Sequence, residues 1–139
     1  MKKNYSISQI RTIEDTGFPA DYKVEVGSGA TRFGWSDRHP YSVFSVDENW
    51  NNKGYEIIGI QEDDYNRIDN NGMSEEQSYE YTPNLNGCVA YLKSSVVTTE
   101  KGDFKIYNTV EWSEKAKRWV KGHGSYGLGF RTRYFDYSF

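Results

Sequence analysis

The chain has 139 residues, of which 17 % are aromatic, and it carries a net charge of −3 at pH 7. This length suits a single domain with its own core, and no apolar run approaches the roughly 18 residues that a membrane-spanning helix needs. The acidic balance also argues against a protein that coats nucleic acid generally, because such domains are usually basic.

The first predicted element is a short helix in "SISQIRTIEDTGFP". Ser6 suits its N-cap, Ile7, Ile10 and Ile13 fall on one side, and Gly17 with the following proline favours its end. The first ten residues lack the apolar stretch of a signal peptide, so we expect none.

Period-two patterns separated by turn residues then predict a series of strands. Residues 62–76 form the most irregular stretch, in which Asn71-Gly72 favours a turn. We predict a mostly β, single-domain protein over residues 1–139, built as a curled antiparallel sheet or small barrel with one short N-terminal helix. The strands are expected at 21–26, 30–35, 41–46, 54–61, 77–82, 88–98, 103–112, 117–122 and 129–139.

The C-terminal stretch "GFRTRYFDYSF" interleaves arginines with aromatic rings. In an extended chain Arg131, Arg133 and Tyr137 point to one side and Tyr134 to the other. Arginine suits phosphate oxygens and a ring can stack a nucleobase, so these residues are candidate ligand contacts. The alternative is that the arginines pack over aromatic rings and pair with acidic residues elsewhere.

Two further stretches carry candidate ligand contacts. In "WSDRHPY" Trp35 offers a ring and Arg38 a cation, although a plain β-turn explains the same letters. In "RIDNNGMSEEQ" the spacing of a calcium loop fails, because an arginine and a serine fall where carboxylates are required. Asn71 and Gln77 remain as side chains that could hydrogen-bond a ligand or cap a strand end.

Catalytic and metal chemistry have little support in the sequence. His39 and His123 are the only histidines. Cys88, the single cysteine, is expected in a strand with its side chain in the protein core. The glycine-rich stretch around His123 would suit a phosphate-binding loop or a simple strand connection. We predict no catalytic residue, no metal ligand and no cofactor, and a single cysteine suits a reducing compartment.

Charge is unevenly distributed along the chain. Residues 47–80 hold ten acids against two bases, whereas residues 101–139 hold eight bases against four acids. The two regions either pair with each other, or the acidic region is free to imitate nucleic acid on the surface of a partner.

Three segments together, "GSGATRFGWSDRHPYSV", "RIDNNGMSEEQSYEYTPNLNG" and "GFRTRYFDYSF", carry a resemblance. They resemble a family of short, uncharacterised proteins of tailed phages and prophages that close on an aromatic Tyr-Asp-Tyr-Ser-Phe tail. The similarity covers residues 24–139, with a longer hairpin over residues 93–108 and a departure at His39-Pro40. It implies a phage origin and a place in the cytoplasm of an infected host, and it carries over no catalytic residue. The matching residues are Asp37, Arg38, Arg67, Asp69, Gly72, Met73, Gln77, Tyr79, Tyr81, Arg131, Arg133 and Tyr137.

Two functions follow as expectations. The first is a homo-oligomeric anti-defence protein that sequesters a small phosphorylated, nucleotide-type immune signal without cleaving it. The second is an inhibitor that binds a host defence nuclease or CRISPR effector through its acidic residues 47–80. Neither function involves a membrane.

Overall fold

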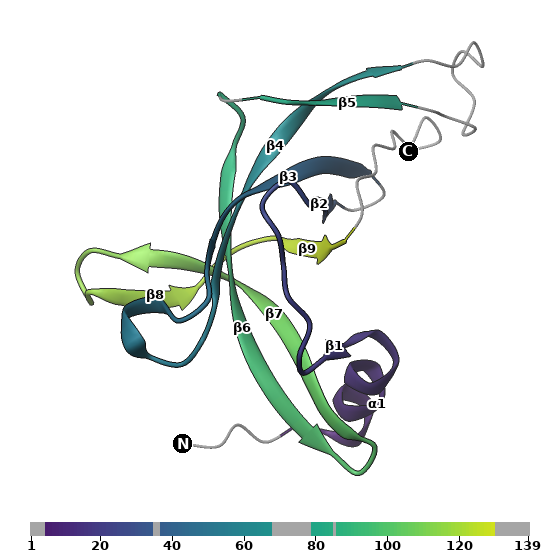
Figure 1. The fold of residues 1–139 in the computed structure, drawn as a ribbon, viewed down its shortest axis with the longest axis vertical. Helices are drawn as coiled ribbons and strands as arrows, with labels where there is room; N and C mark the ends of the chain where they lie inside the picture. The colour runs from purple at the N-terminus through teal and green to yellow at the C-terminus, as the bar shows by residue number, and fades with distance from the viewer. Residues whose placement is uncertain (1–4, 35–36, 68–78, 85, 130–139) are drawn as a thin grey trace.

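The computed structural model describes residues 5–34, 37–67, 79–84 and 86–129. Within these ranges it contains one α-helix, one short 3₁₀ helix and nine strands (Figure 1). They are α1 (Ile7–Thr16), β1 (Phe18–Pro19), β2 (Gly29–Phe33), β3 (Arg38–Asp47), η1 (Trp50–Asn52), β4 (Ile57–Arg67), β5 (Tyr79–Pro83), β6 (Val89–Thr99), β7 (Gly102–Ser113), β8 (Arg118–Lys121) and β9 (Ser125–Leu128). No helix in these ranges reaches the length and apolar character that crossing a bilayer requires.

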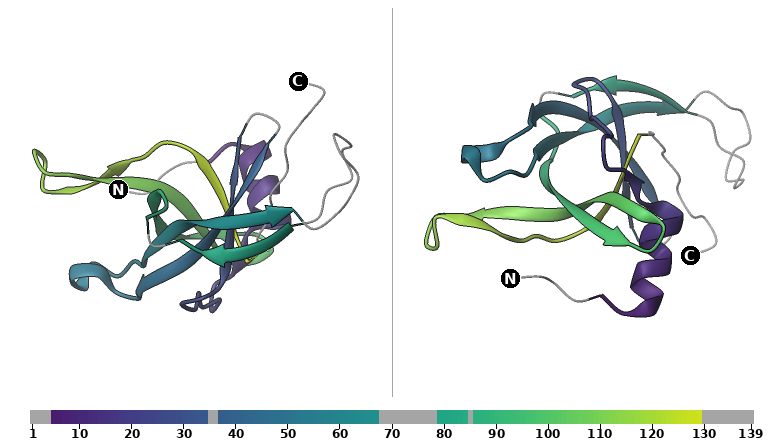
Figure 2. Two further views of the ribbon diagram at one scale, coloured as in Figure 1. Left: turned by 90° about the horizontal axis from the view of Figure 1, so that it is seen from above. Right: turned by 60° about the horizontal axis from the view of Figure 1, so that its bottom comes forward.

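All nine strands belong to one antiparallel sheet in the described part of the chain. Its order is β1-β7-β6-β4-β3-β2-β9, with β5 added to β4 and β8 added to β7. The sheet curls into a half-barrel, so that β9 at one end approaches β7 near the other (Figure 2). This confirms the predicted mostly β fold and its curled antiparallel sheet.

The N-terminal helix forms where its capping residues predict it. The Ser6 hydroxyl accepts a hydrogen bond from the Gln9 amide, and the Gln9 side chain accepts one from the Ser6 amide, which completes a capping box. At the other end the Gly17 amide donates to the Ile13 carbonyl at 2.7 Å. Ile13 is the buried residue of this helix, whereas Ile7 remains 73 % exposed.

The main core lies on the concave face of the half-barrel. Fully buried aliphatic residues from its central strands, including Ile58, Ile60 and Leu92, fill the centre. Burial of such a side chain contributes about 1.5–3 kcal/mol to folding. Four half-buried aromatic residues pack around this centre: Phe18, Tyr22, Tyr107 and Tyr126.

A second cluster of aromatic rings joins the β3–β4 connection to the β7–β8 hairpin. Trp119 of β8 lies at its middle, with ring centres 5.9 Å from Trp50, 5.3 Å from Trp112 and 5.3 Å from Tyr91. Tyr55 stacks on Trp50 at 6.0 Å. Paired rings at these separations stabilise beyond the area that they bury. The cluster therefore fixes the position of the β7–β8 hairpin against the sheet.

Residues 21–26, predicted as a strand, are not one. Val24 is buried, which accounts for the alternating pattern, but the backbone makes no ladder. The Tyr22 carbonyl instead accepts a hydrogen bond from the Lys105 ammonium at 2.6 Å. A backbone carbonyl satisfied by a side chain needs no neighbouring strand.

The start of the stretch 62–76, which was predicted to be irregular, is a regular strand. β4 continues through residues 62–67 and pairs there with β5. Asp63 is 3 % exposed, and its carboxylate accepts a 2.6 Å hydrogen bond from the Ser42 hydroxyl. A buried carboxylate with such a partner is tolerated within a sheet. The acidic residues at the start of this stretch were therefore not a sign of irregular structure.

Candidate functional site

In the described part of the chain, the half-barrel stays open along a seam between β7 and β9. β1 pairs with β7 only as far as Lys105, and β8 pairs with it only from Val110 onward. The Gly122 amide extends the β8 pairing by one hydrogen bond to the Thr109 carbonyl, at 2.9 Å. Tyr107 lies between these two paired stretches.

The ladder geometry shows which backbone groups face the seam. In an antiparallel sheet, successive residues direct their N–H and C=O groups to opposite neighbours. Thr109 bonds toward the β8 side, so Tyr107, two residues earlier, directs its groups to that side as well. The Gly129 amide bonds to the Gly29 carbonyl across β2, so Tyr126 directs its groups away from β2. No strand in the described ranges pairs with these two residues at the seam.

A polar hollow of about 470 Å³ opens at one end of the seam and is called the lysine hollow below. Its described lining includes two lysines and no carboxylate. The Lys93 ammonium lies 4.3 Å from the centre of the Tyr55 ring, a cation–π contact, and no ion pair forms to either lysine within the described ranges. The lining residues are Lys93, Ser95, Tyr107, Asn108, Thr109, Val110, Trp119, Val120, Lys121, Gly122, Gly124, Ser125 and Tyr126.

The β8–β9 connection holds one wall of the lysine hollow in place. The Thr109 hydroxyl donates to the Gly124 carbonyl at 2.9 Å. Trp119, from the aromatic cluster, forms part of the same wall, and its indole N–H is buried without a partner in the described part of the chain. The wall is therefore fixed by β7 and by the ring cluster together.

Gly124 is required in this wall by its backbone conformation. Its φ is +93°, and a Cβ atom there would lie 3.0 Å from the Tyr126 ring. We expect Gly124→Ala to lower the free energy of unfolding by about 1–3 kcal/mol, as measured by urea titration. Gly34→Ala is the matched control, because its Cβ would meet the Asp37 carbonyl at an ordinary 3.4 Å. Equal stability of both variants would contradict the expectation.

An apolar hollow of about 520 Å³ opens at the other end of the seam and is called the aromatic hollow below. Phe18, Phe33, Tyr107 and Tyr126 contribute rings to its lining, and Lys105 is the charged residue among the lining residues described. The other lining residues are Thr16, Gly17, Ile106, Gly127 and Leu128.

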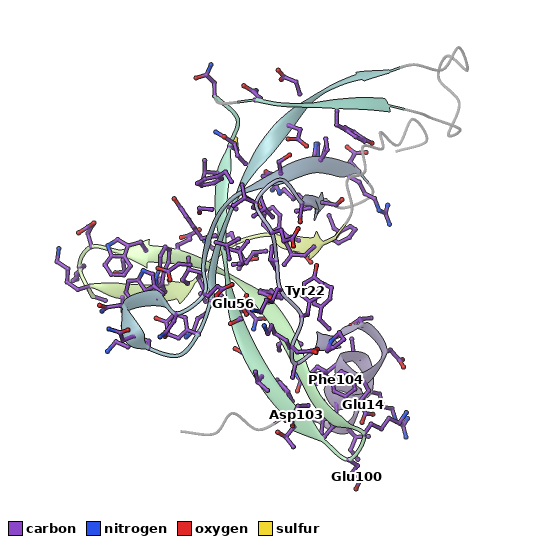
Figure 3. The ribbon with its side chains drawn as sticks, in the orientation of Figure 1. Glu14, Tyr22, Glu56, Glu100, Asp103 and Phe104 are labelled. Atoms are coloured by element: carbon purple, nitrogen blue, oxygen red, sulfur yellow. The ribbon has the colours of Figure 1, made fainter. Side chains whose placement is uncertain are left out.

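The charge of Lys105 is neutralised within the fold. Its ammonium lies 2.6 Å from the Glu56 carboxylate, and both side chains are nearly buried, with 12 % and 11 % exposed. The Tyr107 hydroxyl donates to the same carboxylate at 3.2 Å. Lys105 thus contacts both the Glu56 carboxylate and the Tyr22 carbonyl, and these two residues are labelled in Figure 3. Burial, and then the Glu56 charge, raise the pKa of Tyr107 well above its usual range. The aromatic hollow is thus electrically neutral, and its phenol keeps its proton at neutral pH.

The described structure places one of the predicted ligand contacts. Arg38 is exposed, and its guanidinium carbon lies 5.4 Å from the centre of the Phe33 ring, next to the aromatic hollow. The other predicted contacts lie outside the described residues: Trp35, Asn71, Gln77, Arg131, Arg133, Tyr134 and Tyr137.

The residues weighed for catalysis are dispersed. Cys88 is exposed and precedes β6, so the expectation of a core cysteine was wrong. His123 is exposed in the β8–β9 connection, and His39 lies in β3. Within the described ranges, no three histidine, cysteine or acidic side chains gather as metal ligands would.

Two acids of the region 47–80 lie inside the fold in the described part of the chain. Glu56 and Asp63 are both buried, the first against Lys105 and the second against Ser42. The contact between Glu56 and Lys105 is one case of the predicted pairing between the acidic and basic regions. Asp63 was expected on a binding surface, and its burial excludes that role.

Sequence reasoning missed the lysines and tyrosines of the seam. Lys93 and Asn108 are directly opposite each other across β6 and β7, and Lys121 is opposite Val110. Polar residues at paired positions of two predicted strands are a signal that could have indicated a polar face there.

The chain matches no family model, no curated protein and no solved structure. The resemblance to the phage proteins therefore stays a prediction, and the hollows are interpreted from their own chemistry.

Proposed function

We propose that this protein binds a small phosphorylated molecule of nucleotide type at the lysine hollow and holds it without cleaving it. The observation that carries the proposal is a concave site whose described lining has two lysines and no carboxylate, in a protein whose net charge is negative. Lysine ammonium groups bind phosphate as point charges, and a local positive site suffices for a small ligand.

The rest of the lining supports binding over catalysis. The described residues of the hollow include hydroxyl, amide and glycine groups that can hydrogen-bond an anion, but no histidine, cysteine or carboxylate. Histidine and carboxylate side chains are the most common general bases, and a serine or threonine nucleophile needs such a base beside it. The described lining therefore favours sequestration of an intact ligand.

The phage resemblance suggests a setting for this activity. A phage protein that binds a nucleotide-type immune signal would lower its free concentration in the infected host. Arg131 and Arg133 follow β9 closely in sequence, and their predicted phosphate contacts belong to the same proposal. Assembly into a homo-oligomer is part of it as well.

Isothermal titration calorimetry tests the proposal. The probes are inorganic pyrophosphate, nucleoside diphosphates, cyclic dinucleotides and ADP-ribose. We expect at least one probe to bind, and Lys93→Gln or Lys121→Gln to weaken it about tenfold or more, since a hydrogen bond to a charged group contributes about 1.5–3 kcal/mol.

Lys115→Gln is the matched control, because it removes the same charge from an exposed lysine that does not line the hollow. Absence of heat with every probe would exclude the proposal, and so would an equal loss of affinity in Lys115→Gln. Recovery of the bound probe intact after denaturation of the protein distinguishes sequestration from cleavage.

A further inference from the structure

The two hollows are adjacent parts of one surface. Tyr107 and Tyr126 line both of them, one from each side of the open seam. The lysine hollow lies toward Asn108 and Ser125, and the aromatic hollow lies toward Ile106 and Gly127. A molecule bound at either hollow therefore meets the same two tyrosines.

The hollows differ sharply in the chemistry that they offer. The lysine hollow presents cations that no described carboxylate compensates. The aromatic hollow presents four rings around a charge that is already neutralised by Glu56. Aromatic walls favour a planar ring that can stack on them or meet them edge to face. The pair of hollows suits a ligand that is anionic at one end and a flat ring at the other.

Backbone groups at the seam add a further requirement. The N–H and C=O groups of Tyr107 and Tyr126 face it without a strand partner in the described ranges. Backbone polar groups in partly buried positions are normally hydrogen-bonded, to water or to another group. A ligand ring that carries hydrogen-bond donors and acceptors can bond to these backbone groups, and a hydrocarbon ring cannot.

We infer that the two hollows form one elongated site for a nucleotide, with the base in the aromatic hollow and the phosphates at Lys93 and Lys121. The edge of the base hydrogen-bonds the seam backbone of Tyr107 and Tyr126. This inference rests on the proposed function, and it adds that the base is recognised and that the ligand crosses the seam.

Titration calorimetry with separated parts of the ligand tests the inference. The probes are inorganic pyrophosphate, the four nucleosides, and ADP, GDP, CDP and UDP. At least one nucleoside diphosphate is expected to bind about tenfold or more tightly than pyrophosphate, because stacking of its base adds affinity. Pyrophosphate that binds as tightly as all four nucleoside diphosphates overturns the inference but leaves the proposed function intact. Failure of all these probes to bind overturns the inference, and it overturns the proposed function as well if cyclic dinucleotides and ADP-ribose also fail to bind.

Two variants separate the two ends of the site. Phe33→Ala removes a ring from the aromatic hollow, so it is expected to weaken the nucleoside diphosphate about tenfold while pyrophosphate binds as before. Lys121→Gln is expected to weaken pyrophosphate and the nucleoside diphosphate alike. Equal loss of pyrophosphate binding in both variants contradicts a site with two distinct ends.

A measurement on the unmodified protein keeps the inference testable if Phe33→Ala does not fold. Amide chemical shifts from ¹⁵N spectra are recorded as the nucleoside diphosphate is added. The amides of Tyr107 and Tyr126 are expected to shift most among the residues of β7 and β9. Shifts confined to β8 and its connection would overturn the placement of the base.

Discussion

Replacement of Glu56 by alanine is expected to lower the free energy of unfolding by about 3–5 kcal/mol, the range for loss of one partner from a buried ion pair. The ammonium of Lys105 lies 2.6 Å from this carboxylate and is 12 % exposed, so the variant would leave a charge with little access to water. The Tyr107 hydroxyl would also lose its acceptor. Urea unfolding followed by far-ultraviolet circular dichroism measures the loss.

Glu114→Ala is the matched control, because this glutamate pairs with Lys117 at 2.8 Å but is 78 % exposed. Its loss is expected to cost no more than about 0.5 kcal/mol, as solvent screens an exposed pair. The double variant Glu56→Leu, Lys105→Met removes both charges and should recover much of the stability. A loss below about 1 kcal/mol in Glu56→Ala would show that the ion pair is solvated in the folded protein.

The second large effect is expected at Trp119. Trp119→Ala should cost about 3–5 kcal/mol, because truncation of a large ring leaves a cavity that the structure fills only in part. The ring contacts Trp50, Tyr91 and Trp112 at centre distances of 5.3–5.9 Å and so connects two hairpins. Thermal unfolding and urea titration both report the change.

Trp112→Ala provides the graded comparison. Trp112 belongs to the same cluster but is 37 % exposed, so its truncation removes fewer buried contacts and should cost clearly less. If the two variants were equally destabilised, Trp119 would have no special place at the centre of the cluster. Trp119→Phe should retain most of the stability, because it keeps a ring at this position.

The sequence predicts those elements whose signals are local. The helix follows from Ser6, from the spacing of its isoleucines and from Gly17, which are all signals within a few residues of one another. The β6–β7 hairpin follows from two alternating runs around a glycine-containing turn, with Gly102 at φ +125°. Such features require no knowledge of the rest of the chain.

Two of the failed predictions depend on distant partners. Residues 21–26 alternate like a strand, yet Lys105, more than 80 residues away, satisfies the Tyr22 carbonyl and no strand is needed. Asp63 was predicted to lie in an irregular stretch, but it lies in a strand, where the Ser42 hydroxyl donates a hydrogen bond to its carboxylate. Burial and hydrogen bonding across the fold override local pattern in both cases.

The candidate site is also non-local, and for that reason no motif indicates it. Its lysines come from β6 and β8, and its tyrosines from β7 and β9. They meet only because β1 and β8 each cover part of β7 and leave a gap between them. The extent of strand pairing, which sets this gap, is the property that single-sequence patterns predict least well.

The open seam has a mechanical consequence for the whole sheet. β7 and β9 lie toward opposite ends of its strand order, and no described ladder joins them directly. A ligand that bridges Tyr107 and Tyr126 would connect the two ends of the sheet at the place where no described ladder connects them. Binding of such a ligand would then oppose the separation of β7 from β9, and the sheet would be more rigid with the ligand bound than without it.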